Sequence, residues 1–349
     1  MSTDSRRKDE HLRYAEITNS AQQRQPNDFA GVRLLHQALP EQSLAEVDLS
    51  TSLIDGLQID YPFYIEAMTG GSKKGGVING QLASLAAKHH LAMATGSMSI
   101  IFKDPATKPT FAVVRQQNPD GVIIANLSAN ASVDQAAAAI DLVKANALEI
   151  HLNSAQEVVM PEGAQDYHWL TNIKKLAARF PVIVKEVGFG MTKETIQLLA
   201  DAGVAGINVS GRGGTNFAAI ESLRGKRIGA SGDWSPLFDW GQSTVESLLE
   251  ARSTNHQQAT VIASGGVQSP ADVVKAGTLG ASAVGVAGFF LHHLQTNPDG
   301  LDQLITSWRQ NIAAMMLLTG CQRFADLANT PFVLNPQLES YVRQRHLTR

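Results

Sequence analysis

The 349-residue sequence contains a single cysteine, Cys321. One thiol cannot form an intrachain disulfide, and it excludes a zinc site built from several cysteines. Acidic and basic residues are mixed along the chain, and the formal net charge of −3 gives no reason to expect nucleic acid as a partner. These absences favour a reducing compartment, and we expect a cytoplasmic protein.

Long hydrophobic runs are also missing. The N-terminal stretch MSTDSRRKDEHLRYAEI is polar and charged, unlike a signal peptide. No stretch reaches the roughly 18 uninterrupted apolar residues that a membrane span requires, so we expect no membrane association. The hydrophobic fraction of 44% and the 29 glycines are typical of a globular α/β protein with many tight turns.

Short apolar runs alternate with helix-like amphipathic stretches from about residue 46 onward. The apolar runs predict strands over 62–68, 91–96, 121–126, 148–153, 181–187, 205–210, 260–266 and 282–288. Helical patterns such as 79–90, 134–146, 169–180, 193–203 and 270–280 lie between them. Alternation of this kind predicts parallel strands joined by right-handed crossovers.

Eight such units favour an α/β fold of the (β/α)8, or TIM, barrel type. We expect an N-terminal arm over residues 1–45 and a barrel with C-terminal helices over 46–349. The alternative is a doubly wound open sheet, which would typically carry a phosphate-binding glycine turn after its first strand. MTGGSKKGG follows that strand here, and it lacks the G-x-G-x-x-G spacing.

Function in such a barrel gathers at the C-terminal ends of the strands. Those ends are rich in polar side chains and glycines: Met68 to Gly71, Gly96, Ser97, Asn126, His151, Asn153, Lys185, Ser210, Gly265, Gly266, Ala287 and Gly288. The glycine turns after the last two strands can aim backbone N–H groups at a phosphate, although each alone is most simply a turn.

Lys185 lies in an otherwise apolar strand, so its ammonium must find an anion. It could form a structural ion pair with Glu186 or Glu157, or stabilise negative charge on a reduced flavin. In the glycine-rich stretch VSGRGGTNF (209–217), Arg212 would supply a cation to a ligand, with hydroxyl groups from Ser210 and Thr215.

His151 and Asn153 share one face of their strand, and Gln156 and Glu157 follow on the loop or first helical turn. A carboxylate beside amide oxygens suits Mg²⁺ carrying a diphosphate, although Glu157 could equally be a capping carboxylate. In RRKDEHLRY (6–14), a helix would place Arg7, Lys8 and His11 on one face; the alternative is a solvated tail.

Several segments occur together in an order that resembles the type 2 isopentenyl-diphosphate Δ-isomerases, flavoprotein enzymes of isoprenoid biosynthesis. They are RRKDEH, IEAMTGG, GSMS, ANL, HLNSAQE with PEG, VKEVGFGMT, VSGRGGTNF and SGG. The resemblance implies a homo-oligomeric barrel, a tetramer or octamer, that binds FMN and Mg²⁺. It further implies interconversion of isopentenyl and dimethylallyl diphosphate without net redox change, on flavin that NADPH has reduced.

The resemblance also implies roles for particular residues. FMN would contact Ala67, Met68, Thr69, Ser97, Asn126, Lys185, Ser210, Thr215, Gly265, Gly266, Ala287 and Gly288. Substrate diphosphate would be bound by Arg7, Lys8, His11, Ser97, His151, Asn153 and Gln156, with Mg²⁺ on Glu157. Gln156 and Lys185 are the catalytic candidates. Some family members carry an arginine where this chain has Ser99, so the arm or Lys103 would replace that cation.

The chemistry requires an acid placed directly against an alkene in a dry pocket. No pair of carboxylates buried in apolar surroundings suggests itself in the sequence for that work, which agrees with the implied role of reduced FMN as the proton donor and acceptor. A 2-hydroxy-acid oxidase would need a histidine base where Arg212 stands, and an inosine-monophosphate-dehydrogenase-like enzyme would need a cysteine in a barrel loop. A phosphate-binding scaffold without chemistry need not retain the basic arm and the residues from His151 to Glu157 together.

Overall fold

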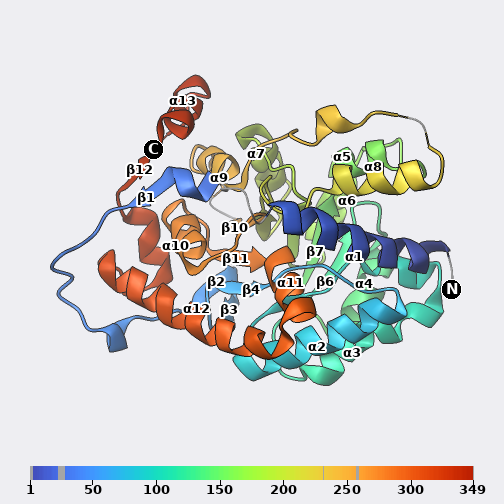
Figure 1. Cartoon of the computed structure of the whole chain (residues 1–349), viewed down its shortest axis with the longest axis horizontal. Coiled ribbons are helices and arrows are strands. Elements are labelled where there is room, and N and C mark those ends of the chain that lie inside the picture. Colours follow the sequence, from blue (N-terminus) through green and yellow to red (C-terminus); the bar gives the residue numbers. More distant parts are fainter. Residues whose placement is uncertain (1–2, 23–27, 231, 257–258, 349) are drawn as a thin grey trace.

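The fold is a closed parallel barrel, and the computed structural model describes residues 3–22, 28–230, 232–256 and 259–348 (Figure 1). Eight of the described strands close in the order β10-β11-β4-β5-β6-β7-β8-β9. They are β4 Phe63–Ile65, β5 Met93–Ala94, β6 Ile123–Ser128, β7 Ala147–Leu152, β8 Val182–Glu186, β9 Gly206–Asn208, β10 Thr260–Ser264 and β11 Ala283–Val286. Each overlaps its predicted range, and the closed order confirms the TIM barrel over the open sheet.

Helices surround the barrel and follow most of its strands. They are α2 Lys73–His89, α3 Pro109–Gln117, α4 Val133–Val143, α5 Ser154–Val159, α6 Leu170–Ala177, α7 Lys193–Asp201, α8 Phe217–Arg227, α9 Thr244–Ala251, α10 Pro270–Thr278 and α11 Gly288–Thr296. The crossover from β9 to β10 contains two of them, α8 and α9. Apolar side chains between the helices and the outer face of the barrel form the larger hydrophobic core.

Helix α2 begins six residues earlier than the sequence pattern predicts, because the glycine-rich stretch after β4 is partly helical. The Ser72 side chain accepts the N–H of Gly75 at 3.0 Å and caps the helix. A side chain at Gly76 would lie about 3.1 Å from Thr110 on α3. Close packing of α2 on α3 therefore favours glycine where an isolated helix would not.

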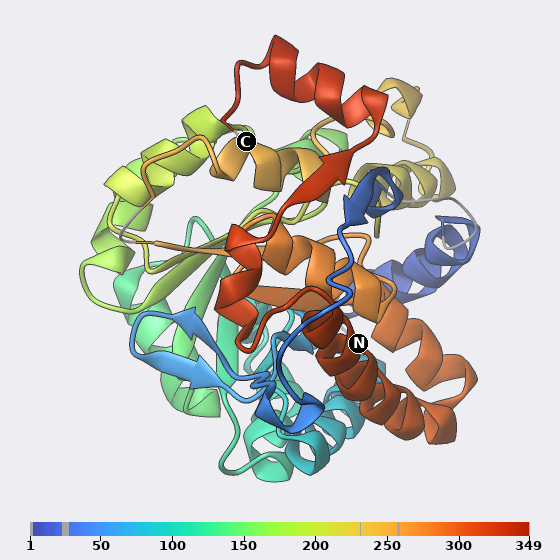
Figure 2. The ribbon, with the colours of Figure 1, turned by 90° about the vertical axis from the view of Figure 1, so that its left-hand side faces the viewer.

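A β-hairpin closes the N-terminal end of the barrel (Figure 2). Its strands, β2 Thr51–Ile54 and β3 Leu57–Ile59, pair antiparallel, and their apolar side chains pack with those of the barrel interior. The Thr260 hydroxyl donates to the Leu53 carbonyl oxygen at 2.8 Å, which ties the hairpin to β10. With this end sealed, a ligand must enter at the opposite end, where the strands terminate.

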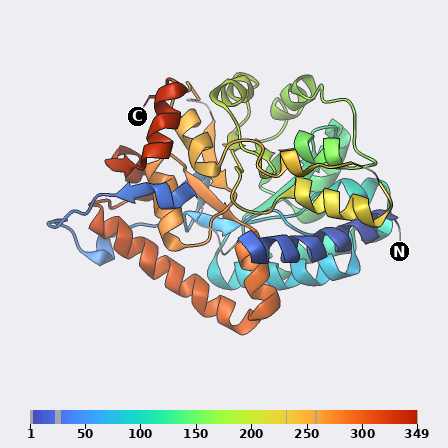
Figure 3. The ribbon, with the colours of Figure 1, turned by 45° about the horizontal axis from the view of Figure 1, so that its top comes forward.

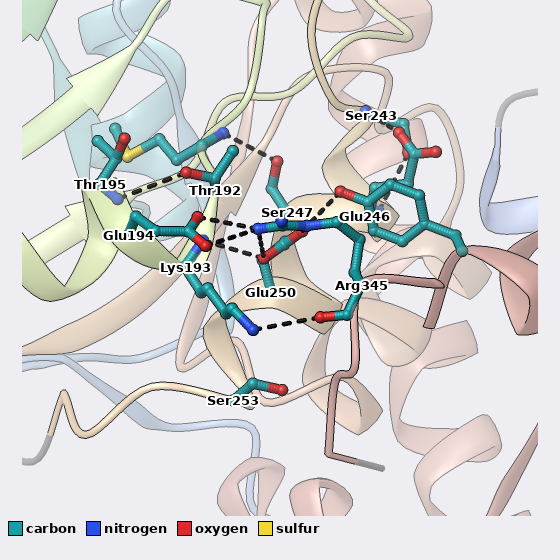
Figure 4. Close-up of polar contacts among 12 residues, drawn as sticks. Thr192, Lys193, Glu194, Thr195, Ser243, Glu246, Ser247, Glu250, Ser253 and Arg345 are labelled. Atoms are coloured by element: carbon teal, nitrogen blue, oxygen red, sulfur yellow. Dashed lines mark hydrogen bonds and ion pairs between the residues drawn. The ribbon is translucent and has the colours of Figure 1, made fainter. Parts of the chain in front are cut away.

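The C-terminal segment packs on the outside of the barrel. It consists of α12 Pro298–Leu318, β12 Phe332–Leu334 and α13 Pro336–Gln344, and β12 pairs antiparallel with β1 Val32–Leu34. Just beyond α13, the Arg345 guanidinium donates to the buried carboxylate of Glu250 on α9 at 2.7 Å. The Arg345 carbonyl oxygen accepts a hydrogen bond from the Lys193 ammonium at 3.2 Å (Figure 4).

The N-terminal arm is helical over α1 Thr3–Gln22 and contacts α2, α8 and α11. Figure 3 shows this dark blue helix between α8, in yellow, and α2, in cyan. The same three helices flank the C-terminal end of the barrel, so α1 lies beside the open mouth. Within the described ranges, no helix is long and apolar enough to cross a bilayer.

Candidate active site

A cavity of about 490 Å³ opens at the C-terminal ends of the barrel strands. Its lining includes every residue to which the family resemblance gave a cofactor, substrate or metal role: Arg7, Lys8, His11, Ala67, Met68, Thr69, Ser97, Asn126, His151, Asn153, Gln156, Glu157, Lys185, Ser210, Thr215, Gly265, Gly266, Ala287 and Gly288. The fold therefore brings the arm and the strand ends to one place. The role of each residue stays a prediction.

Arg212 is an exception to the predictions made from the same glycine-rich stretch. Its guanidinium donates to the Asp239 carbonyl oxygen at 3.3 Å and lies 3.9 Å from the Glu246 carboxylate. It is directed to the loop before α9, whereas neighbouring Thr215 lines the cavity. The prediction that Arg212 supplies a cation to a ligand is therefore wrong.

The helical arm is attached to the barrel by side chains next to its predicted ligands. The Ser72 hydroxyl donates to the Asp9 carboxylate at 2.5 Å, and Arg227 of α8 pairs with Glu10. His11 Nε2 lies 2.8 Å from a carboxylate oxygen of Glu221, also on α8. These contacts place the cationic face of α1 over the cavity, and they support the helical alternative over a solvated tail.

Lys185 is buried among carboxylates that the sequence did not single out. Its Nζ atom lies 3.7 Å from Glu66 Oε1 and 3.9 Å from Glu149 Oε1. These two, rather than Glu186 or Glu157, are its ion-pair partners. Glu66, directly after β4, and Glu149 on β7 thus form a pair of buried carboxylates in the barrel interior, beside a lysine rather than in apolar surroundings. The Glu186 carboxylate instead accepts three backbone N–H groups from the loop after β8.

The charges of this cluster are set mainly by burial. Burial raises the pKa of Glu149 to about 8, and the nearby Glu66 carboxylate acts in the same direction. Burial alone would lower the pKa of Lys185, but the attraction of Glu66 and Glu149 outweighs it and the pKa is raised. The cluster therefore favours the charged form of Lys185 and the protonated form of Glu149. Asn126 donates to Glu149 Oε1 at 2.5 Å and holds it in place.

His151 is a neutral imidazole at the cavity wall. Burial, followed by the charges of Lys185 and Lys8, lowers the pKa of His151 to about 3. Its Nδ1 lies 2.9 Å from Asn126 Oδ1, and the Asn126 amide is oriented by its own donation to Glu149. The amide oxygen accepts, so Nδ1 carries the proton and Nε2 has the lone pair. His151 can accept one hydrogen bond at Nε2 without competing as a base near neutral pH.

Gln156 belongs to a second buried polar group, which involves α8. Its amide donates to Glu221 Oε1 at 2.8 Å, and Arg224 donates to Glu221 Oε2 at 2.7 Å. Burial alone would raise the pKa of Glu221, but the close imidazole of His11, Gln156 and Arg224 outweigh it and lower the pKa to about 2. Sequence reasoning missed Glu221 and Arg224, because a Glu–Arg pair three residues apart is common on solvated helices.

Glu157 lies at the mouth of the cavity on α5, as the sequence predicted. Asn153 donates to its Oε1 at 2.9 Å and the backbone N–H of Ala164 donates to Oε2 at 2.7 Å. No three His, Cys, Asp or Glu side chains in the described ranges gather to hold a metal ion. One carboxylate with amide neighbours fits a hard cation that takes its other ligands from substrate and water.

The loops after β9 and β10 form a narrow backbone cradle. Gly265 and Gly266 have φ angles of 91° and 74°, and a side chain at Gly265 would meet the Gly211 carbonyl oxygen at 2.1 Å. A side chain at Gly214 would meet the Gly266 nitrogen at 2.7 Å. Beside this turn, after the neighbouring strand β11, α11 begins at Gly288 without a side-chain cap, so its first N–H groups lack helical partners. The arrangement fits a phosphate group.

The loop after β5 shows how the chain accommodates Ser99. Met98 is fully buried in the hydrophobic core, and Ser99 lines the cavity with its hydroxyl accepting the Ser128 N–H at 3.3 Å. Lys103, at the end of the same 3-10 helix, also lines the cavity. Both groups proposed to replace the missing arginine, the arm and Lys103, therefore reach the site. Which of them takes over the role of the arginine stays a prediction.

A closed parallel barrel with a backbone phosphate cradle and a buried lysine defines a class of flavin-binding barrels, and the family comparison agrees. A family model described as FMN-dependent dehydrogenase matches residues 109–334. Isopentenyl-diphosphate delta-isomerases of Limosilactobacillus reuteri subsp. reuteri and Latilactobacillus sakei subsp. sakei are 55% and 47% identical, over 98% and 100% of this chain and 98% of theirs. The enzyme of a Streptomyces species is 45% identical over 98% of this chain and 93% of its own. The chain belongs to the isopentenyl-diphosphate delta-isomerase family.

Solved structures show the same barrel at much lower identity. A flavocytochrome b2 variant with benzoylformate superimposes with a TM-score of 0.68 at 19% identity, over 93% of this chain and 80% of the other. A mandelate oxidase variant with 2-hydroxy-phenylacetamide gives 0.63 at 18% identity, over 92% and 90%. These likenesses concern the fold alone.

Proposed function

We propose that this enzyme interconverts isopentenyl and dimethylallyl diphosphate, using FMN reduced by NADPH together with Mg²⁺. The observation that carries the proposal is one cavity that combines a glycine-lined backbone cradle, the buried Lys185 and the cationic face of α1. The cavity would thus bind two separate anionic groups, one at the backbone cradle and one at the cationic face of α1. A single phosphate ligand would need only one of them.

The cofactor assignment rests on the cradle and on family membership. The phosphate of FMN would be held at Gly265, Gly266, Ala287 and Gly288, and its ring system would lie against Lys185 and the ends of β4 to β6. Reduced flavin, when bound, would supply the acid and base chemistry at the alkene. The protonated Glu149 leaves the net charge around Lys185 less negative, which favours an electron-rich ring next to the ammonium.

The substrate assignment rests on the opposite side of the cavity. Arg7, Lys8 and His11 would bind the diphosphate from α1, and neutral His151 would accept a hydrogen bond at Nε2, for example from a diphosphate-bound water. Ser97, Asn153 and Gln156 would add polar contacts, and Glu157 would hold Mg²⁺ against the diphosphate oxygens. With α1 over the mouth, the alkene would be shielded from water, which a weakly basic double bond requires.

Gln156 would orient the alkene end of the substrate rather than act as an acid, since an amide is a poor proton donor at neutral pH. Its amide is already held by the ionised Glu221 at 2.8 Å. We expect Gln156→Ala to lower kcat, and Gln156→Glu to lower it further because it places two carboxylates in contact. Wild-type kcat in both variants would refute the role.

An anaerobic reaction followed by proton NMR tests the function. It contains isopentenyl diphosphate with FMN, NADPH and Mg²⁺, and each of the three is omitted in turn. Dimethylallyl diphosphate should form only in the complete mixture, with NADPH consumption far below product formation. Steady NADPH oxidation without product would refute the isomerase. Light scattering on the same sample tests the expected tetramer or octamer.

A further inference from the structure

Thr244, the first residue of α9, lies behind the phosphate cradle rather than in the cavity wall. Its side chain is buried, with 2% of its surface exposed. The hydroxyl oxygen accepts the N–H of Gly211 at 3.2 Å and lies 2.7 Å from the carbonyl oxygens of both Ser264 and Gly265. A hydroxyl has one proton, which is shared between the two carbonyl groups. Thr244 therefore joins the loop after β9 to the turn after β10.

The two carbonyl groups determine where the cradle N–H groups point. A trans peptide unit is planar, and its N–H is directed opposite to its C=O. The Ser264 carbonyl belongs to the peptide unit that carries the Gly265 N–H, and the Gly265 carbonyl to the unit that carries the Gly266 N–H. By holding both carbonyl groups on its own side, the Thr244 hydroxyl sets the direction of both N–H groups.

The backbone of the loop after β9 packs closely against the start of α9. A side chain at Gly211 would lie 2.2 Å from the Thr244 nitrogen. The glycines at 265 and 266 adopt positive φ angles, a region that glycine leaves easily in both directions. The hydroxyl, together with the Gly211 N–H that donates to the Ser264 carbonyl oxygen at 3.1 Å, supplies the directional restraint that the glycines themselves lack, and it alone contacts the Gly265 carbonyl oxygen among these groups.

Helix α9 is itself firmly anchored, as Figure 4 shows for its polar side chains. Ser243 and Glu246 form a capping box, with Ser243 N–H to carboxylate at 2.7 Å and Glu246 N–H to hydroxyl at 3.1 Å. The Ser247 hydroxyl accepts the Met191 N–H at 3.0 Å, from the loop after β8. Glu250 is held by Arg345 from the C-terminal segment. The helix that carries Thr244 is therefore held in place by hydrogen bonds to several other parts of the chain.

We propose that Thr244 is a positioning residue for the phosphate group of the flavin, acting through the peptide units of Gly265 and Gly266. The inference rests on the proposed function, which places the FMN phosphate on this cradle. Through Thr244, α9 keeps the cradle in the conformation that binds an anion.

The test compares FMN with riboflavin, which lacks the phosphate. Dissociation constants are measured by flavin fluorescence for wild type, Thr244→Val, Thr244→Ser and the control Thr278→Val. Thr278 is a buried threonine whose hydroxyl donates within α10, to the Val274 carbonyl oxygen at 3.1 Å. We expect Thr244→Val to weaken FMN binding by about tenfold, or about 1.4 kcal/mol. Its riboflavin binding should stay within about twofold, and Thr244→Ser should restore FMN affinity, since it retains the hydroxyl.

Three results would overturn the inference. They are unchanged FMN affinity in Thr244→Val, equal weakening of FMN and riboflavin, or a Thr244→Ser variant as weak as Thr244→Val. If Thr244→Val does not fold, Thr244→Cys is judged by the same criteria, because a thiol is a poorer donor of similar size.

The affinities are measured without isopentenyl diphosphate, so they are independent of the reaction. If the wild-type protein does not prefer FMN to riboflavin, both the proposed phosphate site and the role of Thr244 are refuted. A normal FMN preference that depends on the Thr244 hydroxyl, in a protein that forms no dimethylallyl diphosphate, would support the inference and refute only the reaction.

Discussion

Replacing the buried Glu149 by glutamine should make the stability of the protein less dependent on pH. The unfolded chain titrates this carboxyl near about 4.3, whereas burial raises its pKa to about 8 in the folded protein. The folded state therefore holds the proton more tightly. The stability that the protonated group contributes is fully present below about pH 4.3, falls as the pH rises, and is lost above about pH 8.

The size of the effect follows from that interval. Well inside it each pH unit is worth about 1.36 kcal/mol, and near pH 8, where the carboxyl is half ionised, the slope is about half of that. Glu149 should therefore remove about 2.3 kcal/mol of stability between pH 6 and pH 8. Glutamine carries no titrating proton, and its amide oxygen can accept the Asn126 hydrogen bond that Glu149 Oε1 accepts at 2.5 Å. In the Glu149→Gln variant, the free energy of unfolding should therefore fall less between pH 6 and pH 8 than in wild type.

Urea unfolding of flavin-free protein at pH 6, 7 and 8 measures the difference. Other titrating groups are common to both proteins, so they cancel when the two free energies of unfolding are subtracted. Asp60→Asn, at an exposed position, is the control and should give no pH-dependent difference from wild type. Parallel pH curves for wild type and Glu149→Gln would refute the reasoning, since they would mean that Glu149 is already ionised at pH 6.

Three further predictions concern the ion pair between Arg345 and Glu250 and two residues of the cavity. Arg345→Ala should lower the free energy of unfolding by about 2 kcal/mol, because it removes the cation from the buried Glu250 carboxylate, whereas exposed Arg343→Ala should have little effect in the same urea titration. The ring proton resonances of His151, assigned by loss in His151→Gln, should show no titration between pH 5 and 8 in flavin-free protein, and a midpoint near 6.5 would contradict the lowered pKa. Glu157→Gln should raise the Mg²⁺ concentration for half-maximal activity by at least about tenfold, and an unchanged Mg²⁺ dependence would exclude Glu157 as a ligand.

The barrel and the location of the site were predictable because both depend on local patterns. Parallel strands all end at one rim, so identifying a strand also identifies which of its residues face the cavity. Asn126, His151 and Lys185 were found in this way, and each lines the cavity. The helical arm was predictable as an alternative only, since spacing shows which residues share a face but not what that face contacts.

The buried carboxylates were not predictable in the same way. Glu66, Glu149 and Glu221 are ordinary acidic residues in sequence, and nothing local distinguishes them from solvated ones. Partners that decide their burial and charge come from other elements, as with Lys185 on β8, which lies 3.7 Å from Glu66 at the end of β4. Arg212 failed as a predicted ligand for the same reason, because the position of the loop before α9 decided where its side chain points.

The sequence by itself determined the order of strands and helices, the rim where their polar ends meet, and the family to which the chain is similar. These follow from the alternation of apolar residues and from motifs that are contiguous in the chain. Only the tertiary structure decided that Glu149 keeps its proton, that His151 stays neutral and that Thr244 holds the phosphate cradle. Charge states and hydrogen bonds of this kind depend on distance and burial, and those are set only when the barrel closes.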